Sequence, residues 1–207
     1  MLKKLLAVAA LVLGTTTVAF AAPLYTFTDF QSLSGPFDFA QATTIRTNAP
    51  IVIDQIGIWA QTGVLTQNHA LRIRDLTNNV DLFNGAILAG TGTLVNGFRY
   101  IDIPNIAVGA GIQLAVMSDN RSGFNTDLMA FNLTGLTFDP SVTLIGSSFT
   151  NFETVADFPF GDFGTNVIAG ANLLINTAAA VPHPGTLALL VLGGVFGLAR
   201  SRFTRRS

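Results

Sequence analysis

The feature that most limits how this chain can fold is a period-two alternation of apolar and polar residues. Turn residues interrupt it about every 8–12 positions. The run His69–Asp75 alternates most regularly. Ile51–Trp59 alternates too, with a change of parity near Asp54 and Gln55 that indicates a β-bulge. No long amphipathic helical stretch occurs between residues 22 and 180. The pattern predicts an all-β domain, specifically a single antiparallel, jelly-roll-like β-sandwich.

Other segments share the same signature of β-branched and aromatic residues bounded by turn formers. The further strands that we expect are Val80–Phe83, Leu94–Ile103, Ile112–Val116, Leu128–Phe138, Val142–Phe152 and Val167–Ile175. The dipeptides Asn84-Gly85 and Asn96-Gly97 predict tight turns, since both residue types tolerate the positive φ that hairpin turns require.

The N-terminus has the three parts of a secretory signal peptide. Lys3 and Lys4 supply a basic start, Leu5–Leu13 is apolar, and Ala19-Phe20-Ala21 forms a small-residue cleavage site. Cleavage after Ala21 assigns residues 1–21 to the signal peptide and residues 22–180 to the exported domain; cleavage one residue later is the alternative.

The composition of the exported domain excludes one class of function and two kinds of stabilising site. Five arginines face twelve acidic residues there, a net charge of −7. Such a domain does not bind nucleic acid by neutralising phosphates, although it could attract divalent cations. The chain has no cysteine, so disulfides and thiolate metal sites are excluded.

The C-terminal stretch Val181–Ser207 combines three features in a fixed order. Val181, Pro182, His183, Pro184, Gly185 and Thr186 form a proline-bracketed turn. Leu187–Ala199 carries no charge, although it is shorter than the roughly 20 residues that span a bilayer. An arginine cluster follows, made of Arg200, Arg202, Arg205 and Arg206. Arginines after an apolar helix indicate a cytoplasmic tail, with the domain on the other side of the membrane.

This tail resembles the PEP-CTERM sorting signal of Gram-negative bacteria, in which a Pro-Glu-Pro turn precedes a short hydrophobic helix and an arginine cluster. His183 stands where that family has glutamate, and an imidazole cannot replace an acceptor-only carboxylate. The resemblance implies membrane attachment through the helix, recognition by an exosortase after passage through the export machinery, and cleavage near the turn. The product would reach the outer envelope surface or the extracellular matrix. A plain, unprocessed C-terminal anchor is the alternative.

The exported domain carries a second resemblance, to an extracellular domain of unassigned function that recurs in proteins with such a tail. It rests on an ordered set of segments: Phe37–Gln41, Ile51–Ala60, Asn68–Asp75, Ile87–Gly90, Gly97–Pro104 and Gly109–Val116. It implies a β-sandwich fold and indicates no activity.

The residue types that usually carry catalysis are sparse. His69 is the only histidine before the C-terminal turn, and it shares a strand face with Leu71 and Ile73, so we expect it to be buried and hydrogen-bonded. No G-x-S-x-G elbow supplies a nucleophile, and one histidine is too few for a typical zinc site. We therefore expect no enzyme activity, no metal and no cofactor.

Three alternatives remain open at this point. A polysaccharide hydrolase could use Glu153, Asp157 or Asp162, if two of their carboxyl groups lie close across a groove. A calcium-stabilised, carbohydrate-binding adhesion module could use the oxygen-rich segment from Asp119 to Asp127, although Arg121 would repel a cation.

The third alternative is a carbohydrate-binding surface at Trp59, which is a candidate glycan contact if its ring is exposed. The leading expectation is a non-enzymatic structural or adhesive surface module, with extracellular polysaccharide as a candidate partner.

Overall fold

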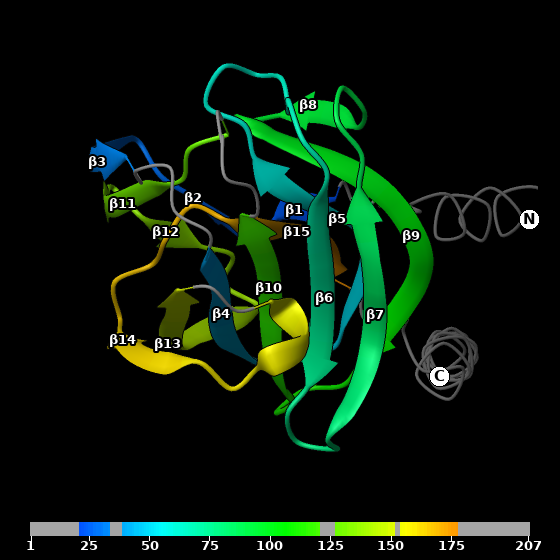
Figure 1. Cartoon of the computed structure of the whole chain (residues 1–207). Helices are drawn as coiled ribbons and strands as arrows, with labels where there is room; N and C mark the ends of the chain where they lie inside the picture. The colour runs from blue at the N-terminus through cyan, green and yellow to red at the C-terminus, as the bar shows by residue number, and fades with distance from the viewer. Residues whose placement is uncertain (1–20, 34–38, 121–126, 152–153, 178–207) are drawn as a thin grey trace, which may run out of the picture. The chain divides into compact units, whose positions relative to one another are not determined.

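The computed structural model describes residues 21–33, 39–120, 127–151 and 154–177, and within them the protein is all-β (Figure 1). The predicted signal peptide up to Phe20 and the predicted sorting tail from Val181 lie outside this range. The strands are β1 Ala22–Pro23, β2 Tyr25–Thr26, β3 Asp29–Leu33, β4 Phe39–Thr47, β5 Ile51–Trp59, β6 His69–Asp75, β7 Val80–Ile87, β8 Thr93–Val95, β9 Phe98–Val108, β10 Gln113–Asn120, β11 Ala130–Thr134, β12 Thr137–Phe138, β13 Val142–Asn151, β14 Gly161–Gly164 and β15 Ala171–Thr177. One 3₁₀ turn, η1, covers Val155–Asp157.

The strands form two main antiparallel sheets. The five-stranded sheet has the order β1-β15-β5-β9-β8, and the six-stranded sheet has the order β14-β13-β4-β10-β6-β7. Figure 1 shows β10, β6 and β7 running next to one another in the larger sheet. The sheets pack together where β15 lies against β4 and β10. Isoleucines 45, 56, 58 and 73 and Leu173 are among the residues of the shared core.

The predicted change of parity in β5 is confirmed, and its cause is a bulge at Asp54. Against β15, Gln55 pairs with Leu174 and Ile53 with the next residue, Ile175, so Asp54 is the extra residue between them. A bulge inserts one residue and re-aims the side chains beyond it. Isoleucines on both sides of the bulge therefore reach the same core, and Asp54 Oδ2 accepts a 2.8 Å hydrogen bond from Asn176 Nδ2.

One of the two predicted Asn-Gly turns is confirmed and the other is wrong. Asn96 and Gly97 connect β8 to β9 with φ values of 49° and 82°. Gly85 instead pairs with Leu71 inside β7. A Cβ at position 85 would lie 2.6 Å from the Phe83 ring, so the glycine makes room for that ring rather than for a turn.

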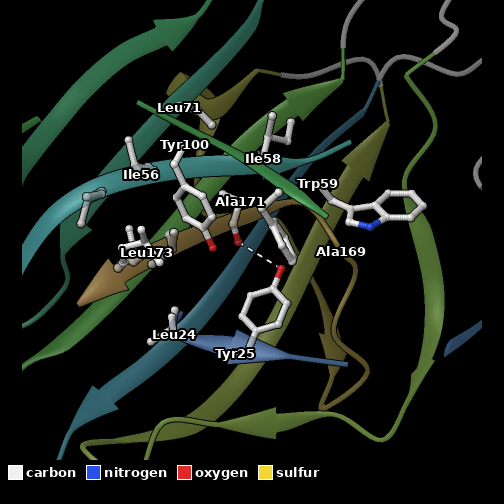
Figure 2. Close-up of a cluster of buried hydrophobic side chains, with 14 of the residues drawn as sticks. Leu24, Tyr25, Ile56, Ile58, Trp59, Leu71, Tyr100, Ala169, Ala171 and Leu173 are labelled. Atoms are coloured by element: carbon white, nitrogen blue, oxygen red, sulfur yellow. Dashed lines mark hydrogen bonds between the residues drawn. The ribbon is translucent and has the colours of Figure 1, made fainter. Parts of the chain in front are cut away.

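Aromatic side chains gather on the face of the five-stranded sheet opposite to Ile56 and Ile58, since Gly57 pairs with Tyr100 and Trp59 with Phe98. Tyr25 meets Phe98 edge-on at a centroid distance of 5.6 Å. Its hydroxyl donates a 3.1 Å hydrogen bond to the Ala171 carbonyl, as Figure 2 shows. Burial raises the pKa of both Tyr25 and Tyr100 far above the usual tyrosine value. The N-terminal segment thus forms an additional buried layer, which the alternation pattern did not reveal.

We predict that Gly57→Ala destabilises the domain. A Cβ at this position would lie 2.5 Å from the Arg99 carbonyl oxygen and 2.7 Å from the Tyr100 ring. Because a backbone atom is involved, the sheet must shift, at a cost of about 1–3 kcal/mol. Trp59 is the chain's single tryptophan, so urea unfolding can be followed by its fluorescence. Gly109→Ala is the matched control, since its Cβ would meet nothing within 4 Å. Equal unfolding midpoints for the two variants would contradict the prediction.

Candidate functional site

Trp59 does not present a platform for a sugar ring. Its side chain is only 7% exposed, and it packs against Phe30 at 5.4 Å and Phe27 at 6.2 Å. The candidate glycan contact at Trp59 required an exposed ring, and that condition is not met because β3 and the residues before it cover the face of β5 that alternation left open. Trp59 belongs to the aromatic layer visible in Figure 2.

His69 is buried and hydrogen-bonded, as the sequence predicted, with an exposure of 1%. Its Nδ1 lies 2.9 Å from the carbonyl oxygen of Asp119, and its Nε2 lies 3.0 Å from Oδ2 of Asp127. A carbonyl and a carboxylate only accept, so both contacts are hydrogen bonds only when the ring is doubly protonated. Neither nitrogen is left to act on an external substrate.

Asp127 is the centre of this buried network. Its carboxylate accepts hydrogen bonds from the backbone N–H groups of Thr66 and Gln67, at 2.8 Å and 2.9 Å, and from the Thr66 hydroxyl at 2.9 Å. Burial alone would raise the pKa of Asp127, but the bonds from Thr66, His69 and Gln67 together outweigh it and lower that pKa. The network fixes the chain just before β6.

The same contacts bear on the calcium alternative. Asp119 accepts a 2.7 Å bond from the Ala70 N–H, and Asp127 is held as described above. Asn120 belongs to β10, while Arg121, Ser122 and Asn125 lie outside the described residues. Within the described part of the chain, no three His, Asp or Glu side chains gather where they could hold a metal ion. The two acids at the ends of this segment therefore already serve the protein's own donors.

The acids of the hydrolase alternative are only partly described. Asp157 lies in a capping box around η1, where its carboxylate accepts a 2.7 Å bond from the Thr154 N–H. Glu153 and the side chain of Asp162 fall outside the described parts, so a pairing of carboxyl groups stays a prediction.

Residues 154–160, which we call the cover segment, lie on the outer face of the six-stranded sheet. Val155 packs against Ala42, Ala115 and Met117 in a small second core. The Arg72 guanidinium donates a 2.8 Å hydrogen bond to the Val155 carbonyl and bonds Asp81 on β7 through Nε and Nη2, each at 2.9 Å. The hydrogen bond from Arg72 also lowers the pKa of Asp81. Arg72 thus ties the cover segment to the sheet.

Beside the cover segment lies a shallow hollow, which we call the Gly146 groove. Its volume is about 280 Å³, and it is lined by Thr44, Ile145, Gly146, Ser147, Ser148 and Phe160. Gly146 pairs with Thr44 on β4, and the missing side chain leaves the space between its neighbours open. Phe160 forms one wall and is braced by Phe158, whose ring lies edge-on to it at 5.4 Å.

Sequence reasoning did not find Arg72, Asp81 or the groove. A glycine inside a predicted strand signals a bulge or a close approach, so Gly146 within Val142–Phe152 was the available clue. Nothing in the local pattern indicated that residues 154–160 would return to cover the sheet.

Neither a scan of protein-family models nor a search of curated proteins found a match for this chain. Within the described residues, no helix has the length and apolarity needed to cross a bilayer.

We predict that Asp127→Asn lowers the free energy of unfolding by roughly 2–4 kcal/mol near neutral pH, because an amide brings its own donor to a site that already faces several donors. The free energies of unfolding of the variant and of the wild type should also converge in acid. A lowered folded-state pKa stabilises the fold above the unfolded value of about 3.9, and that contribution is lost as the pH falls through the folded value. Urea unfolding from pH 7 to pH 3 measures both effects. A gap that stays constant over this range would contradict the role of the ionised carboxylate.

We also predict that Arg72→Met loosens the cover segment. The substitution keeps much of the apolar side chain but removes the donors to Asp81 and to the carbonyl of Val155, at a cost of about 2 kcal/mol. Hydrogen exchange should rise in residues 154–160. Arg74→Met is the matched control, because Arg74 also bonds Asp81, at 3.0 Å, without reaching the cover segment. Similar exchange in both variants would show that Arg72 does not hold this segment.

Proposed function

We propose that this protein is an exported, non-enzymatic surface or matrix module. Its domain is a jelly-roll-like β-sandwich, sorted by the PEP-CTERM-like tail through an exosortase. The carrying observation is where the folded domain begins and ends. Strand β1 begins at Ala22, directly after the predicted cleavage site, and β15 ends at Thr177, shortly before the proline-bracketed turn. The described strands therefore all lie within the interval between the two predicted processing sites.

The pairing of these end strands supports the same proposal. Ala22 pairs with Ile175, so the point where the signal peptide joins and the point where the tail departs lie near each other on one sheet. A new N-terminus at Ala22 leaves the pairing of β1 with β15 in place. The core residues lie between Leu24 and Ile175, so all of them remain in the chain after both flanking segments are removed.

The absence of an enzymatic role is proposed from the commitments of the described polar groups. His69 uses both ring nitrogens inside the domain, and Asp127 holds the chain before β6. Asp157 caps η1. These groups serve the fold, and an adhesive or structural role needs no free acid–base pair.

The packing of the two main sheets supports the proposal of a β-sandwich. Strand β15 in the five-stranded sheet contacts β4 and β10 in the six-stranded sheet. Alternate residues of these strands meet in one core, the arrangement typical of two antiparallel sheets stacked face to face.

Intact-mass analysis of surface material tests the proposal. In a bacterium that contains an exosortase, we expect the surface protein to begin at Ala22 and to lack Leu187–Ser207. His183→Glu restores the carboxylate of the resembling family and should raise the processed fraction, whereas replacing Pro182 and Pro184 by alanine should lower it. A surface protein that keeps its tail would contradict sorting. Folded protein in the cytosol with both ends intact would contradict export.

A further inference from the structure

The Gly146 groove is a hollow that the buried histidine network does not reach and to which the cover segment contributes only the Phe160 wall. Two register shifts bracket it. Against β4, Ile145 is an extra residue between Leu144 and Gly146. Against β14, the register changes between Ser147 and Ser148. Bulges re-aim side chains and are frequent beside binding sites. Here the bulge leaves Ile145 41% exposed at the edge of the groove.

The chemistry of the lining is mixed and uncharged. Thr44 and Ser148 lie on the outer face of the sheet by strand alternation, on either side of Gly146. No described residue accepts or donates a hydrogen bond at either hydroxyl, so both are available to a ligand. Phe160 and Ile145 supply apolar surface. None of the lining residues carries a charge.

A neutral sugar ring matches this combination. A pyranose presents C–H groups on one face, which can pack on the Phe160 ring, and hydroxyls at its rim, which can bond serine and threonine. The volume of about 280 Å³ lies just below the range of drug-sized ligand sites, roughly 300–1,000 Å³, which favours a ligand as small as one sugar unit. Uronates and phosphates are disfavoured, since no cation lines the groove and the exported domain carries −7.

We propose that the Gly146 groove binds one neutral pyranose unit of an extracellular polysaccharide. This inference rests on the proposed function, which delivers the domain to such polymers. The open groove lets the chain continue on both sides of the bound unit. In this proposal Phe160, and not Trp59, supplies the aromatic contact to the sugar.

The full chain, purified in a detergent without a sugar headgroup, is titrated calorimetrically with neutral oligosaccharides of glucose, mannose and galactose. The corresponding monosaccharides and an oligogalacturonate are run in parallel. We expect binding to at least one neutral oligosaccharide, weaker binding to its monosaccharide, and none to the uronate. No binding to any neutral sugar at millimolar concentration would overturn the proposal. So would a preference for the uronate.

Gly146→Val is the decisive variant, because it fills the groove with side chain. The nearest atom to a Cβ at this position is the Gly164 carbonyl oxygen, at 3.4 Å, which is an ordinary van der Waals contact. We expect affinity to fall at least about tenfold, the change that 1.4 kcal/mol produces. Gly109→Val makes the same change in open space and should bind like the wild type. Equal affinities of the two variants would place the sugar elsewhere.

Ser148→Ala keeps the test decisive if Gly146→Val does not fold. It removes one hydroxyl from the groove and should weaken binding about fivefold, as expected for one hydrogen bond. An unchanged affinity would overturn the assignment of Ser148. This experiment is independent of sorting. A processed surface protein that binds no neutral sugar would overturn only the proposal that the groove binds a sugar. A sugar-binding protein that stays in the cytosol would overturn only the proposal that the protein is exported.

Discussion

The structure depends on covering both faces of its two main sheets without the help of a disulfide. Tyr25 and Phe27 from the N-terminal segment close the outer face of the five-stranded sheet. Val155 does the same on the six-stranded sheet, in a smaller patch. Each cover converts a face that would meet solvent into buried surface, and burial of apolar area is the main favourable contribution to folding. Because the chain has no cysteine, the domain relies on such packing together with its buried hydrogen bonds.

The sequence predicted features that depend on neighbouring residues, and it missed contacts between segments that are distant along the chain. Strands β5 and β6 match their predicted bounds, because alternation and flanking turn residues are properties of neighbouring positions. The bulge at Asp54 was visible as a change of parity. The exposure of Trp59 was left open because alternation identifies two faces and does not say what covers the second. Its partner Phe30 stands far from it along the chain, and no local pattern links the two.

The polar groups show the same division. The burial of His69 followed from its apolar neighbours on the strand, whereas its partner Asp127 first suggested a calcium loop. Arg72 was counted only as a charge, yet its guanidinium bonds both a neighbouring strand and the carbonyl of Val155. A charged residue on an alternating strand indicates the polar face. Whether that face meets water or another segment is decided by tertiary packing.

The position of β15 has a mechanical consequence. This strand is the last of the described domain and lies between β1 and β5, pairing with β5 from Ala171 to Thr177. A pull at Thr177 along the strand would strain all of these backbone pairs together instead of opening them one after another. A domain held by its C-terminal end would therefore resist drag through concerted shear of the β15–β5 ladder, together with the two pairs that join β15 to β1.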